Sequence, residues 1–174
     1  FEDCIVYLTN HEQGELVQVA AYGPKNPAAF DILNPIKIKV GTGIAGTAAS
    51  LQEIQKVDDV SVDDRYIVDD QARSAELAIP MLFKGECLGV VDSEHSSTHF
   101  FTDRHCQILT TVADLAAARI AHIRGLGALE KTKRAYQDLV ETASDVLFRI
   151  NLEGKFTFVN PVAVQLTGYA EQEL

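Results

Sequence analysis

The chain has 174 residues, of which 47% are apolar and 23% charged, and its formal net charge is −10 at pH 7. This length allows one domain, or one and a half. The acidic balance and the lack of a basic patch exclude direct nucleic-acid binding. Apolar runs such as residues 77–83 are too short to cross a bilayer, so we expect no membrane partner within the chain. Because the sequence opens on Phe1 within a strand-like pattern, we expect it to be a piece of a longer protein.

The three cysteines, Cys4, Cys87 and Cys106, are far apart and odd in number. This spacing favours a reducing compartment, the cytoplasm, and excludes a disulfide framework or a zinc knuckle. Cys4 and Cys87 lie in strand-like runs, where cysteine usually packs as a small apolar residue.

Alternating apolar and polar residues predict strands over 3–9, 15–22 and 36–40, with Cys4, Val6 and Leu8 on one face of the first. A glycine-rich run of small residues, 41–49, then predicts a short helix packed closely on a sheet. A strand over 54–57 and an acidic loop over 58–70 follow. The two strongest strands, 76–83 and 86–92, form a hairpin about Lys84-Gly85.

Thr102 is suited to cap a long helix, in which apolar residues recur at helical spacing as far as Ile123. The element order predicts an α+β fold, an antiparallel sheet with helices on one or both faces. We expect Gly125 and Gly127 to interrupt this helix, at about 1 kcal/mol each. An apolar stripe then continues over a connecting helix, 125–144, which could form a dimeric coiled coil.

The last part of the sequence predicts a second hairpin, over 146–150 and 156–159, about Glu153-Gly154. Asn160-Pro161 is typical of the start of a short helix. We expect the chain to end within another such helix at Leu174.

Residues 1–124 resemble the GAF domain family. The run Gly41-Thr42-Gly43-Ile44-Ala45-Gly46 is similar to its central turn, residues 57–66 to the loop over its pocket, and residues 74–80 and 89–95 to its last hairpin. Phe101-Thr102-Asp103 before a long helix is also typical of the family. The resemblance implies a small-molecule pocket between the sheet and the loop.

Residues 145–174 resemble the start of a PAS domain, through Asp145–Ile150, Gly154–Asn160 and Thr167-Gly168-Tyr169. A segment this short cannot normally bury enough apolar area to fold alone. We therefore expect it to be held by a second copy of the chain, or to be partly disordered. The order GAF then PAS resembles bacterial sensor histidine kinases, which implies kinase domains downstream in the parent chain.

One branch of the GAF family reduces free methionine sulfoxide through cysteines. Ala45 and Asp69 stand at the matching positions here, and Cys87 lies in a hairpin strand. Since such a reductase needs a thiolate nucleophile, we expect no catalytic residue and no enzyme activity in this chain.

The same resemblance implies a ligand-binding set. In that branch, acidic residues at the positions of Glu76, Asp92 and Glu94 hold the substrate's amino group. Asp92 and Glu94 alternate along one strand and should share a face. Tyr66 and Arg73, in and after the loop over the pocket, complete the candidate ligand-binding residues. The alternative is that these acids serve only packing and loop anchoring.

Other ligands of the family lack their residues here. The cyclic-nucleotide signature is present only as Phe101 and Asp103, and no cysteine lies in the loop for a bilin. The histidines suit solvated or capping positions rather than an axial haem ligand. The acidic loop lacks the rhythm of a calcium site, so we expect no cofactor and no metal.

Two functions compete on this sequence. In the first, an unknown small ligand orders the loop, and the change passes through the connecting helix of a homodimer. In the second, the GAF domain is a ligand-free dimerisation spacer, with a pocket filled by its own side chains, such as Tyr66 and Phe83.

Overall fold

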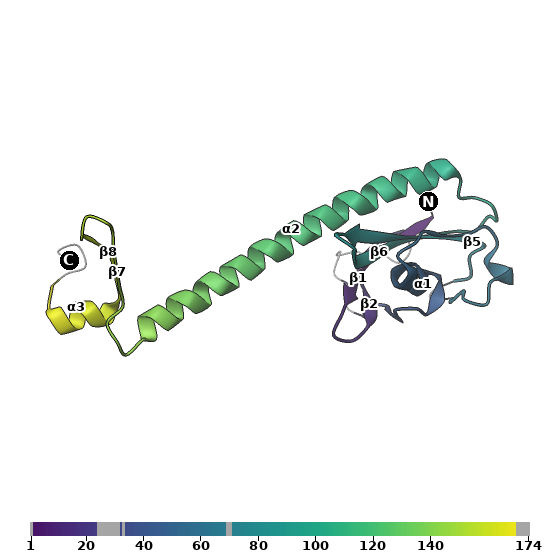
Figure 1. Ribbon diagram of the computed structural model, residues 1–174. Helices are drawn as coiled ribbons and strands as arrows, with labels where there is room; N and C mark the ends of the chain where they lie inside the picture. The colour runs from purple at the N-terminus through teal and green to yellow at the C-terminus, as the bar shows by residue number, and fades with distance from the viewer. Residues whose placement is uncertain (1, 24–31, 33, 69–70, 170–174) are drawn as a thin grey trace. The chain divides into compact units, whose positions relative to one another are not determined.

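The computed structural model describes residues 2–23, 32, 34–68 and 71–169 (Figure 1). The chain divides into two compact units, Phe1–His122 and Ile123–Leu174. The first unit contains a six-stranded antiparallel sheet, in the order β3-β2-β1-β6-β5-β4. Its strands are β1 (Asp3–Asn10), β2 (Glu15–Tyr22), β3 (Lys37–Lys39), β4 (Gln55–Val57), β5 (Ala75–Phe83) and β6 (Glu86–His95). Every strand predicted for this unit is present, and β6 runs to His95 rather than ending at Asp92.

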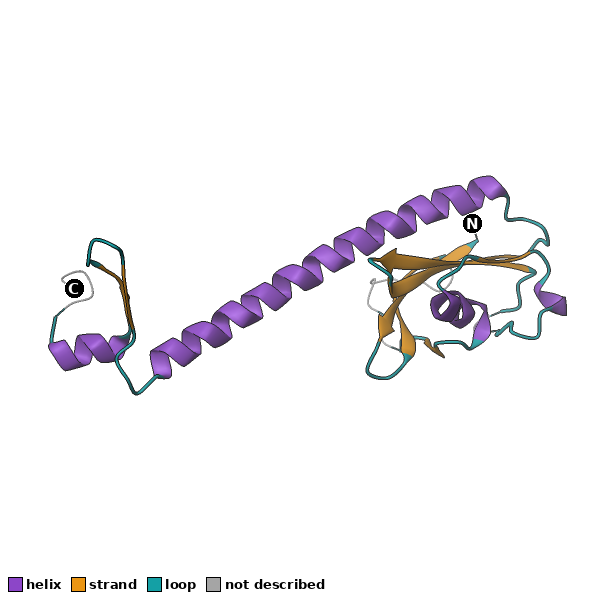
Figure 2. Cartoon of the chain, in the orientation of Figure 1, coloured by secondary structure: helices purple, strands orange, loops and turns teal. Residues whose placement is uncertain are grey.

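Both faces of this sheet are covered, because its strands alternate apolar residues between two cores. On one face Ile5, Tyr7 and Val90 pack with the helix α1 (Gly43–Leu51). On the other face Leu77 and Ile79 pack with the first turns of α2 (Asp103–Thr142). Figures 1 and 2 show the two helices on opposite sides of the sheet. The first unit is therefore an α+β domain with a three-layer arrangement.

The short helix α1 lies unusually close to the sheet, as its small residues predict. A Cβ atom added at Gly46 would lie 2.5 Å from the Lys39 backbone oxygen, and one at Gly43 would lie 2.9 Å from Ile67 Cδ1. Gly43 also has a φ of +70°, which favours glycine. These two glycines bring the start of α1 to the cavity described below.

The long helix differs from its prediction. We expected a closing helix that ends near Arg124 and a separate helix over 125–144, but α2 runs without a break from Asp103 to Thr142. Gly125 and Gly127 have open space around their Cα atoms. A cost of about 1 kcal/mol at each is small beside the cooperativity of a helix this long, so the glycines do not end it.

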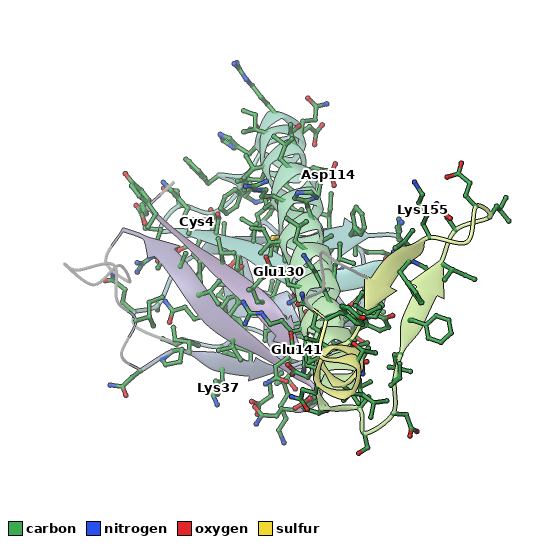
Figure 3. The ribbon with its side chains drawn as sticks, turned by 90° about the vertical axis from the view of Figure 1, so that its left-hand side faces the viewer. Cys4, Lys37, Asp114, Glu130, Glu141 and Lys155 are labelled. Carbon is green, nitrogen blue, oxygen red and sulfur yellow. The ribbon has the colours of Figure 1, made fainter. Side chains whose placement is uncertain are left out.

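The side chains of α2 differ in how far they are buried. Leu109, Ala113 and Ala117 are buried against the sheet. Apolar side chains also lie exposed along the helix: Ile108, Val112, Leu115, Ile123, Leu126, Leu129, Tyr136 and Leu139. Asp114, Glu130 and Glu141 are exposed charged side chains of the same helix (Figure 3).

The second unit contains a small hairpin and a helix. The strands β7 (Phe148–Ile150) and β8 (Phe156–Val159) pair antiparallel, and α3 (Pro161–Thr167) follows. The predicted hairpin and the helix after Asn160 are therefore confirmed, whereas the helix expected at the end of the chain falls mostly in residues 170–174, outside the described part.

Asn160 organises this second unit. Its side chain is fully buried. The side-chain oxygen accepts hydrogen bonds from the backbone N–H groups of Leu147 (3.0 Å) and Ala163 (3.3 Å). The side-chain nitrogen donates to the backbone oxygen of Asp145 (2.9 Å). The side-chain amide of Asn160 therefore caps α3 and also holds the backbone of Leu147, the residue just before β7.

Candidate functional site

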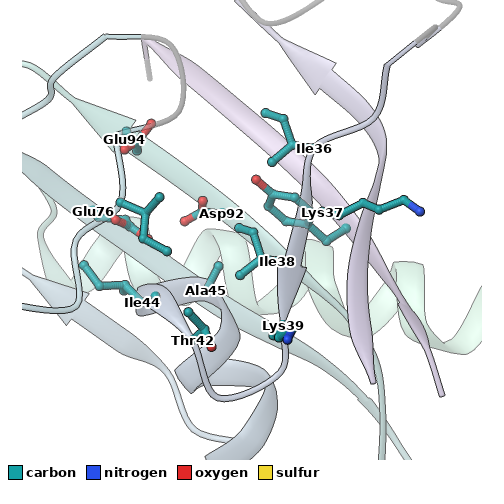
Figure 4. Close-up of a pocket in the computed structure, with 13 residues that line it drawn as sticks. Ile36, Lys37, Ile38, Lys39, Thr42, Ile44, Ala45, Glu76, Asp92 and Glu94 are labelled. Carbon is teal, nitrogen blue, oxygen red and sulfur yellow. The ribbon is translucent and has the colours of Figure 1, made fainter. Parts of the chain in front are cut away.

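A cavity of about 280 Å³ lies between the sheet and the start of α1 (Figure 4). Its walls come from β1, β3, β5, β6, α1 and the loop that precedes β5. The lining residues are Tyr7, Ile36, Lys37, Ile38, Lys39, Thr42, Gly43, Ile44, Ala45, Ile67, Glu76, Asp92 and Glu94. This is the place that the family resemblance gives for a small-molecule pocket.

Three carboxylates gather on one side of the cavity. Asp92 and Glu94 alternate along β6 and therefore share a face, and Glu76 on β5 is the direct partner of Glu94 in the strand register. Figure 4 shows the three side chains next to one another. All three are buried, at 5%, 6% and 3% exposure for Glu76, Asp92 and Glu94. The structure thus brings together the three acids that the sequence singled out.

The rest of the cavity wall is mostly aliphatic. Ile36 and Ile38 line the cavity from the β3 side, and Ile44 and Ala45 line it from α1 (Figure 4). The Lys37 side chain extends away from the acids (Figure 4). An aliphatic wall beside buried carboxylates suits a small ligand with a cationic group and an apolar arm.

Tyr66 stands beside the acids. Its hydroxyl oxygen accepts a hydrogen bond from the Arg73 backbone N–H at 2.8 Å. Burial, followed by the charge of Glu94, its hydrogen bond with the Tyr66 hydroxyl and the charge of Glu76, raises the pKa of Tyr66 to about 12. Tyr66 is therefore a neutral donor next to Glu94 at any physiological pH.

Arg73 is not among the residues that line the cavity. Its guanidinium Nη2 lies 2.9 Å from Asp3 Oδ2 in a buried ion pair, and its Nε lies 3.8 Å from Glu2 Oε2. Arg73 thus contacts β1, and the ligand contact that the sequence predicts for it stays a prediction. Sequence reasoning missed Asp3, because an ion pair across 70 residues leaves no local pattern.

Phe83 also differs from its expected place. It packs against the core on the α2 side of the sheet and so does not fill the cavity. Tyr66, the other expected filler, packs against the core on the α1 side.

Two acidic residues of the loop, Asp59 and Asp63, are held by local partners. Asp59 accepts from Ser61 N–H at 3.0 Å and caps the short 3-10 helix η1 (Val60–Val62). Asp63 Oδ2 lies 2.7 Å from Arg65 Nη2, so this arginine neutralises part of the loop's charge. Asp69 and Asp70 lie outside the described residues. Within the part of the chain that the structure describes, no group of His, Cys, Asp and Glu is placed to hold a metal ion.

The thiols are poorly suited to act as nucleophiles. Burial raises the pKa of Cys4, Cys87 and Cys106 above the ordinary value of a thiol, so each stays protonated at neutral pH. Cys87 lies outside the acid-lined cavity, and its Sγ donates to the Gly89 oxygen at 3.2 Å. Ala45, at the position of a reductase cysteine, lines that cavity.

Two of the histidines have structural roles at the end of the sheet. His105 Nδ1 accepts from the backbone N–H of Thr102 at 3.1 Å. Thr102 precedes α2 and His105 is its third residue, so this is the contact that the N3 side chain makes in a capping box. His95 Nδ1 accepts from the Ser97 N–H, and the His95 ring stacks on Phe100 with centroids 3.4 Å apart. The capping role that the sequence suggested holds for His105.

None of the helices in the described stretches combines the length and apolarity that a membrane span needs.

Comparison with known proteins identifies relatives of both parts. The chain is 35% identical over 68 residues to the free methionine-R-sulfoxide reductase of Escherichia coli, covering 39% of this chain and 41% of that protein. It is 27% identical over 179 residues to a methyl sulfide methyltransferase-associated sensor of Methanosarcina acetivorans, covering 98% of this chain but 18% of that protein. The chain therefore spans less than half the length of either relative.

Solved structures agree with the fold. The GAF domain of a phosphoenolpyruvate-protein phosphotransferase from Coxiella burnetii is similar, with a TM-score of 0.64 at 24% identity, over 73% of this chain and 76% of that one.

The PAS domain family model matches residues 134–174, and the GAF domain family model matches residues 1–120. Since that second match covers more than half of the sequence, the chain belongs to the GAF domain family.

Proposed function

We propose that this chain is the sensory part of a signalling protein and that its GAF cavity binds a small amine or amino acid. The observation that carries the proposal is the trio of buried carboxylates, Glu76, Asp92 and Glu94, beside an aliphatic wall. Burying several like charges together is costly, and a protonated amine among them would offset part of that cost.

The cavity also bounds the size of the ligand. A volume of about 280 Å³ falls just below the range of typical drug-sized pockets, which starts at about 300 Å³. A molecule the size of one amino acid fits this space, whereas a bilin or a haem does not. The aliphatic residues favour a short apolar arm on the ligand.

The relatives support a receptor of this kind. The Escherichia coli relative is, by its name, an enzyme that acts on free methionine-R-sulfoxide, and the Methanosarcina acetivorans relative is a sensor. With Ala45 in the cavity and protonated thiols elsewhere, we propose that this chain keeps a ligand site without reductase chemistry.

We further propose that the output is a histidine kinase in the same parent chain, in the cytoplasm, and that the chain acts as a homodimer. The exposed apolar residues of α2, including Leu126 and Leu129, favour pairing with a second copy along the helix. The order of a GAF domain, a long helix and a PAS segment supports this arrangement. The three thiols are free, which suits a reducing compartment.

Isothermal titration calorimetry tests the ligand. We expect L-leucine or L-methionine to bind, together with the amine 3-methylbutylamine, while 4-methylpentanoate, which is leucine without its amino group, does not. Asp92→Asn should weaken binding about 30-fold or more, because it removes one partner of a buried charge pair. Glu130→Gln, an exposed acid on α2, is the matched control. Wild-type protein that binds none of these amines would refute the proposal.

The second candidate function is a ligand-free dimerisation spacer. It is favoured by the exposed apolar residues of α2, which do not depend on the cavity. A spacer would be a dimer by light scattering and give no heat with any amine, whereas the sensor we propose would show both.

A further inference from the structure

We infer that Tyr66, Arg73 and Asp3 are positioning residues of the amine site: they orient the Glu94 carboxylate without touching the ligand. The inference rests on the proposed function. It starts from a closed ring of contacts that joins the loop before β5 to the two central strands, β1 and β6.

The first half of the ring sets the direction of one proton. Tyr66 Oη accepts the Arg73 N–H at 2.8 Å, so the tyrosine's own proton points elsewhere. Glu94 is hydrogen-bonded to the Tyr66 hydroxyl, and this bond, together with the charges of Glu94 and Glu76, helps to keep the hydroxyl protonated. An ionised carboxylate has no proton to donate, so the hydrogen bond between the two side chains is donated by the Tyr66 hydroxyl to Glu94.

The second half of the ring fixes the residues that hold Tyr66. Arg73 Nη2 lies 2.9 Å from Asp3 Oδ2, with Arg73 at 7% and Asp3 at 1% exposure. The other oxygen of Asp3 accepts the Glu94 backbone N–H at 3.3 Å. Asp3 is also the direct strand partner of Glu94. One buried carboxylate thus anchors both the arginine that carries the donor to Tyr66 and the backbone of the acid that Tyr66 orients.

The consequence concerns how Glu94 meets a ligand. A hydrogen bond from Tyr66 restricts the orientation of the Glu94 carboxylate, which lines the cavity with Glu76 and Asp92. Preorganised charge binds more tightly than charge that must be ordered first. Removing the donor should also raise the pKa of the carboxyl group, since a hydrogen bond to the charged form favours that form.

Tyr66→Phe removes only the hydroxyl, and Tyr22→Phe, at an exposed tyrosine, is the matched control. Without any ligand, NMR should show the Arg73 amide proton exchanging about tenfold faster in Tyr66→Phe, because its acceptor is lost. With L-methionine as the probe, calorimetry should show an affinity about 5- to 10-fold weaker. The affinity should also be measured between about pH 4 and pH 8. The pH below which the affinity falls should be higher in Tyr66→Phe than in the wild type, because the amine needs an ionised Glu94.

Two results with Tyr66→Phe would overturn the inference. An unchanged Arg73 amide in Tyr66→Phe, or an affinity lowered equally at every pH as general damage would do, overturns the inference. Asp3→Asn should lower the affinity for L-methionine, as Tyr66→Phe does. Tyr22→Phe should bind L-methionine as tightly as the wild type. If wild-type protein binds neither L-methionine nor the other amines, the proposed function fails and this inference fails with it, even if the Arg73 amide responds as expected.

Discussion

The sheet of the first unit and the hairpin of the second differ in how much of their apolar surface is covered. Ile5, Tyr7, Leu77 and Ile79, on the two faces of the larger sheet, are each 1% exposed or less. In the hairpin, Phe148 is 58% and Ile150 52% exposed. Both regions have antiparallel strand pairs with register shifts. Among the described residues, only the first region joins this pairing to a core on each face.

This difference separates two sources of structure. The first unit is held by packing on both sides of one sheet. The second owes its geometry largely to one polar residue, Asn160, because a two-stranded hairpin is marginal in water without a covered face. Mutations should therefore act through packing in one unit and through hydrogen bonding in the other.

The largest effect is expected from Gly89→Ala in the first unit. Gly89 lies on β6 between β1 and β5. A Cβ atom added there would lie 2.1 Å from the backbone oxygen of Tyr7 and 2.5 Å from Met81 Cε. Backbone cannot yield there without disturbing the central strands, so we expect a loss of about 3 kcal/mol in the free energy of unfolding by urea. Gly125→Ala, which meets no atom, is the control. Equal stability of the two variants would contradict a close-packed sheet.

A smaller effect, confined to the second unit, is expected from Asn160→Ala. The change leaves the N–H groups of Leu147 and Ala163 and the Asp145 oxygen without their side-chain partner. We expect a cost of about 2 kcal/mol, measured as faster amide exchange in β7, β8 and α3. Gln165→Ala, at an exposed amide of α3, is the control. If exchange in the first unit changed as much, the two units would not be energetically separate.

Much of the cavity could be predicted from the sequence, because it depends on local rules. The alternation of Asp92 and Glu94 places both on one face of β6. The tight turn at Lys84-Gly85 alone would set Glu76 opposite Ser93, and a register shift between Met81 and Leu82, which the sequence does not signal, sets it opposite Glu94. The same alternation, carried along β5, puts Phe83 on the opposite face from Glu76, since the two are an odd number of residues apart. Alternation along β5 therefore predicts that Phe83 lies outside the cavity.

Other features depend on contacts between distant residues and leave no local signal. The sequence singles out Arg73 as a charged residue after the loop, but only the fold brings it to Asp3. The helix break expected at Gly125 and Gly127 failed for a different reason. Propensity predicts a local cost, whereas whether α2 continues depends on the sum over all of its turns.

The smallest effect, of opposite sign to that of Gly89→Ala, is expected from Gly127→Ala in the second unit. The position is helical and exposed, and an added Cβ meets nothing within 4 Å. Alanine loses less backbone entropy than glycine, so α2 should gain about 1 kcal/mol, seen as slower amide exchange around residue 127. The same methyl group would thus destabilise a covered sheet and stabilise an uncovered helix. If Gly127→Ala instead lowered stability in a dimeric sample and had no such effect in a dilute monomeric one, the glycine would lie against a second copy of the chain. In that case the openness of this helix would belong to the monomer alone.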